Sequence, residues 1–319
     1  MKKFLLYITL FIILFIGVFI IQNYPASSQP KNLKKLSDTN NIIKDLETII
    51  NTSKSRNYLN IKTLDTVATY IQTELLKCSN RIDIQAFEVN ERSYKNIIAS
   101  FGPQNGERII VGAHYDVCGD QDGADDNASG VAGLLELARL LKDNNLKYRL
   151  DLIAYSLEEP PFFGTENMGS YIHAKSLHEA KIPVKGMISL EMIGYYSDKQ
   201  NSQDYPLGFL KWFYGNKGNY ITIVEKPLNG TFSKQFKKLS FQKNSILTKS
   251  FIAPFFFGGI DLSDHRNYWK FGYSSVMITN TAFYRDLNYH TKQDVLANLD
   301  VTKIGLVVDG LYRTLTELK

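Results

Sequence analysis

The chain has 319 residues, of which 44% are hydrophobic and 22% charged, so it has the composition of a globular protein with ample length for a core. Its formal net charge is +5, but the Lys and Arg residues are scattered among Asp and Glu. Nucleic-acid-binding proteins usually gather their basic residues on one face. We therefore expect no nucleic-acid partner.

The first segment has the pattern of an export signal. Lys2 and Lys3 precede an apolar run from Phe4 to Ile21 that contains no charge. A membrane span needs roughly 17 to 25 residues, so the run lies between a long signal-peptide core and a short span. We expect residues 1–22 to be a retained membrane anchor rather than a cleaved signal. Either would export the rest of the chain, as an anchored or a secreted protein.

The next segments lead into a single folded domain. Residues 23–50 include a polar, Asn- and Lys-rich stretch and predict a tether, and the domain is expected at 51–319. At 63–77, apolar side chains recur at helical spacing, which predicts an amphipathic helix.

From about residue 82, strand and helix patterns alternate. Apolar runs predict strands at 108–115, 150–156, 186–193 and 274–280, and a strongly apolar helix at 131–141. Strands separated by helices indicate an α/β layer structure with a mixed, mostly parallel sheet. Residues 197–262 break this rhythm with many aromatic, Gly and Lys residues, and they predict an insertion or lid over one end of the sheet.

Side chains that bind metals or protons follow the ends of these strands. Ligands of open α/β sheets bind outside the carboxyl ends of the strands, so these side chains are expected at one edge. Each one alone has a plain structural explanation, such as a core histidine or a solvated turn, but together they indicate a functional site. The set is His114, Asp116, Glu158, Glu159, Glu191 and His290.

Two stretches strengthen this interpretation. Glu191 lies inside the apolar run MISLEMIG, where an unpaired buried carboxylate is expensive and needs a cation or a proton. The stretch GADDNASG at 123–130 follows the first strand and opens the apolar helix. Asp and Asn can cap a helix, but three consecutive Asp or Asn residues exceed what one cap requires. One carboxylate there could bridge two cations.

Five segments, in this order and spacing, resemble the M28 family of co-catalytic zinc aminopeptidases. The resemblance covers roughly residues 55–319 and implies a three-layer, zinc-exopeptidase-like sandwich with helices on both faces of the sheet. SDH at 263–265 fits the same family. The five segments are GAHYD (112–116), GADDNASG (123–130), EE (158–159), LEMIG (190–194) and YHT (289–291).

The resemblance also implies roles for individual residues. Glu158 resembles the general base, Asp116 the carboxylate that orients the first histidine, and Tyr289 a tyrosine that steadies the oxyanion. Glu191 departs from the pattern, because many members have aspartate there. The implied substrates are peptides with a free N-terminus. The implied ligands of two Zn²⁺ ions are His114, Asp126, Glu159, Glu191 and His290, with Asp126 as the bridge.

Some aromatic and histidine side chains have open roles. Aromatics of the insertion could line a pocket for an apolar N-terminal residue or simply pack the insertion; they include Trp212, Phe213, Tyr214 and Phe255–Phe257. His265 is expected near the site, either touching substrate or packing. His173 and His178 are expected on a helix surface.

The two cysteines also leave alternatives open. Cys78 and Cys118 are the only cysteines, so an oxidising compartment would allow one disulfide, while two isolated thiols are equally compatible with the sequence.

Two other functions compete with an aminopeptidase. Glutaminyl cyclases share this architecture and a related zinc site, but they carry a different sequence after the bridging aspartate, where this chain has DNASG. A non-catalytic scaffold of the same fold would lose metal ligands, whereas every ligand position here is filled. The sequence therefore favours a metallo-aminopeptidase.

Overall fold

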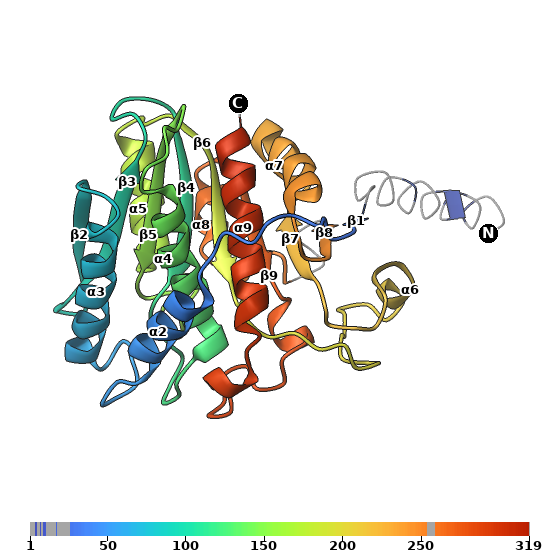
Figure 1. Ribbon diagram of the computed structural model, residues 1–319, viewed down its shortest axis with the longest axis horizontal. Helices are drawn as coiled ribbons and strands as arrows, with labels where there is room; N and C mark the ends of the chain where they lie inside the picture. Colours follow the sequence, from blue (N-terminus) through green and yellow to red (C-terminus); the bar gives the residue numbers. More distant parts are fainter. Residues whose placement is uncertain are drawn as a thin grey trace.

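The computed structural model describes residues 26–253 and 259–318, together with five isolated positions among the first 25 (Figure 1). The anchor predicted for residues 1–22 and the aromatic residues Phe255–Phe257 therefore lie outside the described residues, apart from those isolated positions. Within the described part, no helix is both long and apolar enough to cross a membrane.

The described residues form one mixed nine-stranded sheet. Its order is β1-β8-β7-β9-β6-β4-β5-β3-β2. The central strands β5, β4, β6 and β9 are parallel to one another, and so are β7 and β8, while the remaining neighbours are antiparallel. The strands are β1 (Ser27–Ser28), β2 (Ile82–Val89), β3 (Arg92–Phe101), β4 (Arg108–His114), β5 (Arg149–Tyr155), β6 (Val184–Glu191), β7 (Ile221–Glu225), β8 (Thr248–Ile252) and β9 (Ser275–Thr279).

Helices cover both faces of this sheet, which makes the fold a three-layer sandwich (Figure 1). One face carries α2 (Thr39–Ile50), α3 (Ile61–Leu76), α4 (Gly130–Leu141), α7 (Gly230–Lys243) and α9 (Val301–Glu317). The other carries α5 (Gly169–Glu179) and α8 (His265–Lys270). Shorter elements are the kinked turn η1 (Ala124–Ser129), α6 (Leu210–Tyr214), η3 (Ala282–Tyr284) and η4 (Leu296–Asn298).

The strand β4 shows why its sequence is almost continuously apolar. Ile109 and Val111 join the core beneath α4 and α9, whereas Ile110 joins the core beneath α5 and α8. A parallel strand with helices on both faces buries every side chain, so its sequence does not alternate. The α/β fold class, the four central strands and the helix at 131–141 are confirmed.

The prediction of a tether at 23–50 is wrong for residues 39–50. These residues form α2, whose buried side chains Ile42, Leu46 and Ile49 pack into the core against α4 and α9. Asp38 caps the start of the helix, because its side chain accepts a hydrogen bond from the amide of Asn40. The Asn- and Lys-rich composition obscured an apolar stripe at helical spacing.

The insertion expected at 197–262 also differs from the structure. Its second half is the unit β7-α7-β8, which extends the central sheet, since β7 pairs with β9 and β8 pairs with β7. The strand β7 is only five residues long, and all five are buried. A short buried strand followed by a Lys-rich helix lacks a clear periodic pattern. Among the described residues of the segment, those near 203–214, with α6, lie outside the sheet.

Candidate metal centre

The residues predicted for the site meet at the carboxyl edge of the parallel strands. His114 and Glu191 are the last residues of β4 and β6, and Glu158 and Glu159 follow the end of β5. The remaining members come from the segments after β4 and β9. Parallel strands end at the same edge of a sheet, so side chains that are distant in sequence become neighbours.

Asp126, in η1, lies between two histidines. Its Oδ1 is 3.4 Å from Nε2 of His114, and its Oδ2 is 3.1 Å from Nε2 of His290. Each oxygen of one carboxylate therefore faces a different imidazole, which is the geometry of a bridging ligand.

Each histidine faces a second carboxylate as well. Glu191 Oε2 lies 3.5 Å from His114 Nε2, and Glu159 Oε2 lies 3.2 Å from His290 Nε2. The cluster thus divides into two donor sets that share Asp126. One set is His114, Asp126 and Glu191, and the other is Asp126, Glu159 and His290.

The electrostatics of the cluster fit cations. Nε2 of His114 and Nε2 of His290 are buried and have no hydrogen-bond partner. Burial, together with the charge of Asp126, raises the pKa of Glu159 to about 8. Although burial opposes its charged form, the carboxylates of Asp126 and Glu159 raise the pKa of His290 to about 10. Unpartnered imidazole nitrogens among crowded carboxylates form a nitrogen and oxygen donor set that suits zinc.

Glu158 stands beside these two sets. Its Oε2 is 3.9 Å from His114 Nε2, beyond hydrogen-bond distance. Burial raises the pKa of Glu158, and the carboxylates of Glu191 and Glu159 add to this effect. Glu158 is therefore the carboxylate at the centre least engaged with the two histidines.

Asp116 holds the adjacent glutamates by their backbone. Its carboxylate accepts hydrogen bonds from the amides of Glu158, at 3.2 Å, and Glu159, at 3.1 Å. The Nδ1 of His114 is 3.3 Å from the backbone carbonyl of Asp116 but 3.6 Å from its carboxylate. Asp116 thus faces Nδ1 of His114 with both its carbonyl and its carboxylate, and the same carboxylate joins the ends of β4 and β5.

The family model described as Peptidase family M28 matches residues 96–314, a range that contains every side chain of this centre. The chain belongs to peptidase family M28. The family is one of zinc-dependent peptide hydrolases, in agreement with the donor set. The uncharacterized protein YfbL of Escherichia coli K12 is 39% identical over 303 residues, which are 92% of this chain and 90% of that protein. A probable leucine aminopeptidase of Arthroderma otae is 26% identical over 301 residues, which are 87% and 73% of the two chains.

Solved structures share the fold of this M28 peptidase. A leucine aminopeptidase precursor from Bacteroides thetaiotaomicron has a TM-score of 0.67 at 17% identity and covers 90% of this chain and 99% of its own. A glutaminyl cyclase from the same species has a TM-score of 0.66 at 18% identity and covers 90% of this chain and 100% of its own. At these identities the likeness shows the fold alone, and both enzymes have it.

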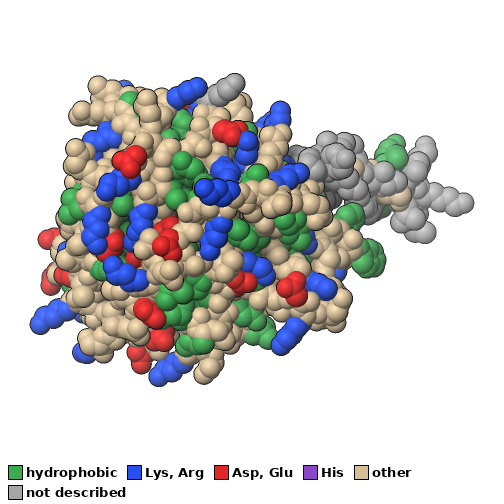
Figure 2. Space-filling view, in the orientation of Figure 1, with side chains coloured by type: hydrophobic (Ala, Val, Ile, Leu, Met, Phe, Trp, Pro, Cys, Tyr) green, Lys and Arg blue, Asp and Glu red, His purple; other side chains and the backbone are tan. Residues whose placement is uncertain are grey.

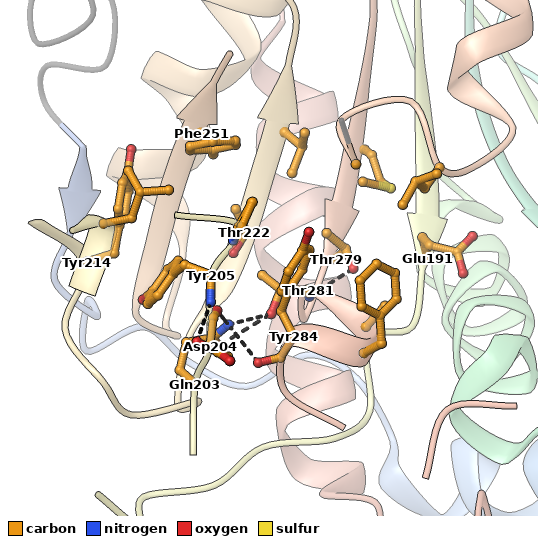
Figure 3. Close-up of a pocket in the computed structure, with 18 of the residues that line it drawn as sticks. Glu191, Gln203, Asp204, Tyr205, Tyr214, Thr222, Phe251, Thr279, Thr281 and Tyr284 are labelled. Carbon is orange, nitrogen blue, oxygen red and sulfur yellow. Dashed lines mark hydrogen bonds between the residues drawn. The ribbon is translucent and has the colours of Figure 1, made fainter. Parts of the chain in front are cut away.

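A large apolar cavity adjoins the metal centre of this M28 peptidase (Figure 3). Its empty volume is about 830 Å³, which includes space open to solvent, and Glu191 and Tyr289 line both it and the hollow over the metal centre. The row of paired residues Glu191, Thr279 and Thr222 crosses β6, β9 and β7 along its floor. Tyr214 and Phe251 lie at the end remote from Glu191 (Figure 3).

Tyr289 lies where the two hollows meet. Its ring stacks on that of His290 at a centroid distance of 3.7 Å and contacts Phe283 at 5.5 Å. Burial raises the pKa of its hydroxyl, which keeps that group protonated and able to donate a hydrogen bond.

Of the aromatic and histidine side chains with open roles, one lines the cavity and others lie outside it. Tyr214 lines the cavity, whereas Trp212 and Phe213 are exposed on the outer side of α6 and do not line it. His265 packs, because its Nε2 contacts the carbonyl of Ile260 at 2.7 Å and its ring contacts Trp269.

The expectation for His173 was wrong, and that for His178 is confirmed. His178 is exposed, but His173 is buried on the inner side of α5, where Nδ1 lies 2.6 Å from the hydroxyl of Tyr268. The side of α5 that faces the sheet contains few apolar residues, so no hydrophobic pattern in the sequence marks it as buried.

Both cysteines are free thiols. Cys118 lies beside the metal centre, where its amide donates to Glu159 Oε1 at 3.1 Å and its sulfur lies within 4.8 Å of ligand atoms of Glu159 and His290. Burial raises the pKa of this thiol to about 11.

The sequence analysis did not predict the supporting roles of Asp294 and Ser263. The Asp294 carboxylate accepts hydrogen bonds from the backbone amides of Asp125, at 2.7 Å, and Asp126, at 3.0 Å. These bonds fix the backbone that positions the Asp126 side chain. The hydroxyl of Ser263 donates to Glu191 Oε2 at 2.6 Å. The available signals were the SDH segment, which contains Ser263, and the surplus of carboxylates at 125–126. Neither pattern shows that Ser263 contacts Glu191 or that Asp294 contacts residues 125 and 126.

Proposed function

We propose that this M28 peptidase is an aminopeptidase that works with two zinc ions. The observation that carries the proposal is the Asp126 carboxylate, whose two oxygens face unpartnered nitrogens of two histidines. The similarity to a probable leucine aminopeptidase supports the same activity.

The chemistry divides between the metal ligands and Glu158. One ion would be held by His114, Asp126 and Glu191, and the other by Asp126, Glu159 and His290. Zinc bound there would lower the pKa of a water molecule and polarise a carbonyl group. Glu158 takes a proton from the attacking water and passes it to the leaving amine. Tyr289 donates a hydrogen bond to the oxygen of the scissile carbonyl, where negative charge develops.

The substrate is held at its N-terminus. A free α-ammonium group is attracted by the buried carboxylates of Glu158 and Glu191, and the first side chain then enters the adjoining cavity. The sheet side of that cavity presents Thr222, Val224 and Met277, and its far end is aromatic. Apart from Glu191, Gln203 and Asp204, the lining is apolar, aromatic or hydroxyl-bearing, and Asp204 is already paired with Lys211. A charged side chain would lose more hydration there than it regains, so large apolar residues are favoured.

The test is a panel of aminoacyl-anilides combined with zinc analysis of the wild type and Glu158→Gln. The wild type should release the anilide from phenylalanine and leucine substrates faster than from lysine or glutamate substrates, and chelation should abolish release. Glu158→Gln should retain its zinc but lose roughly 10²–10⁴-fold in kcat, the usual contribution of a general base.

Other outcomes would identify the competing functions. Near-normal turnover by a fully metallated Glu158→Gln enzyme would remove Glu158 from the mechanism. Cyclisation of N-terminal glutamine peptides without hydrolysis of any anilide would indicate a glutaminyl cyclase. Absence of both zinc and hydrolysis in the wild type would indicate a scaffold.

A further inference from the structure

The short helix α6 is apolar on two opposite sides. Its inner residues Leu210 and Tyr214 are buried and line the large cavity. On its outer side, Phe209 is 43% exposed, Trp212 86% and Phe213 55%, and the rings of Phe209 and Phe213 are 6.4 Å apart. These three aromatic residues are called the outer aromatic patch.

An exposed group of this kind is a sign of a partner. A helix that is apolar all round is normally covered on every side, and clustered exposed aromatics mark interaction surfaces. Lys211 of α6 forms an ion pair with Asp204 at 3.3 Å, so opposite charges are joined beside the patch. Figure 2 shows hydrophobic side chains at the right-hand edge, where α6 lies in Figure 1. The surface therefore favours an apolar or interfacial partner over a charged one.

The patch lies beside the point where the N-terminal segment joins the fold. The hydroxyl of Tyr214 donates to the carbonyl of Ser250 in β8 at 3.0 Å, and the amide of the same Ser250 donates to the carbonyl of Ala26 at 2.9 Å. Next to it, Ser27 of β1 pairs with Lys249 of β8. Both α6 and Ala26 are thus fixed to one residue of β8.

The sequence before Ala26 indicates what the partner is. The uncharged apolar run ends at Ile21, and a trans peptide chain spans at most about 3.6 Å per residue. The end of that run is therefore within about 18 Å of Ala26, whatever path the chain takes. A bilayer that received the run would lie close to α6.

We infer that Phe209, Trp212 and Phe213 rest in the surface of a lipid bilayer, beside an N-terminal run that enters the same bilayer. Tryptophan and other aromatic side chains favour the interface between lipid and water, where the ring is shielded and its polar edge stays hydrated. Since the inner side of α6 lines the cavity, this contact would hold the cavity wall at the membrane surface.

Tryptophan fluorescence tests this inference on the full-length chain in phosphatidylcholine vesicles. The chain has two tryptophans, Trp212 and the buried Trp269, which is 6% exposed. In vesicles, Trp212 emission should shift to shorter wavelength, be quenched by lipids brominated near the headgroup, and become several-fold less accessible to aqueous iodide. Trp212→Phe should lose most of the quenching by brominated lipid while keeping the melting temperature of the wild type.

A matched probe places a tryptophan elsewhere on the surface. Leu228 is 93% exposed and follows β7, at the edge of the sheet opposite to the carboxyl end of β9. The double variant Trp212→Phe/Leu228→Trp should stay accessible to iodide and be unaffected by brominated lipid. If Trp212 behaves like this control, the inference is overturned. Protection of Trp212 from iodide without quenching by brominated lipid would also overturn it, because a protein or a second copy would then cover the patch.

Discussion

At the candidate metal centre, two carboxylates outside the proposed ligand set form hydrogen bonds to the backbone of proposed ligands. The Asp116 carboxylate accepts hydrogen bonds from the amides of Glu158 and Glu159. The Asp294 carboxylate accepts hydrogen bonds from the amides of Asp125 and Asp126. Each pair of bonds fixes two consecutive residues and so sets the direction in which the ligand side chain leaves the chain. Supporting contacts of this kind are what a metal centre needs for a defined geometry.

His173 leads to a prediction about pH and stability. Burial lowers the pKa of this histidine to about 4, below the value near 6.5 expected in the unfolded chain. Between these values the unfolded chain binds a proton that the folded chain does not, so the free energy of unfolding falls as the pH falls from 6.5 to 4. Above pH 6.5 this contribution is constant.

Urea unfolding at pH 7 and pH 5 measures this effect. The wild type should lose about 2 kcal/mol more than His173→Gln between the two pH values. His178→Gln, at the exposed position on the same helix, should keep the loss of the wild type. Equal losses in the wild type and His173→Gln would show that His173 does not titrate in this way.

Among the elements, α2 is an integral part of the core. Besides its apolar side, its buried Asp45 forms an ion pair with Arg139 of α4 at 2.7 Å. The helix α2 thereby packs beside α4 and α9 in the same layer. The parallel strands beneath this layer have the candidate metal centre at their carboxyl ends.

Leu46→Ala tests the place of α2. Leu46 is fully buried, and truncation of such a leucine costs about 2–5 kcal/mol of unfolding free energy. Glu47→Ala, at the exposed neighbouring position, should change it by less than about 0.5 kcal/mol. Urea midpoints of the two variants and the wild type provide the comparison. A wild-type midpoint for Leu46→Ala would mean that α2 is not part of the cooperative fold.

The elements also show how far sequence patterns extend. The four central strands were predictable because strands buried on both faces have nearly continuous apolar sequences, as in residues 108–115. The strand β7 and the helix α2 were not, because five residues or a stripe among Asn and Lys give too little periodicity. Their place depends on long-range pairing, such as that of Thr222 with Thr279, which no local pattern specifies.

At the scale of the whole molecule, the fold brings together side chains from residue 114 to residue 290. Those side chains were predictable because each follows a strand, and the strand ends share one edge. Asp294 and Ser263 were not, because they act on Asp126 and Glu191 across 168 and 72 positions of the chain. Asp126 is the proposed bridge of the centre, since its carboxylate faces both histidines.

The most direct test of this account is zinc per chain, measured by mass spectrometry after equilibration at fixed free zinc. The wild type should bind two ions, and Asp126→Asn should lose both together. Asp120→Asn, at a nearby carboxylate that is exposed, should still bind two. Two retained ions in Asp126→Asn, or none in the wild type, would contradict a centre bridged by Asp126.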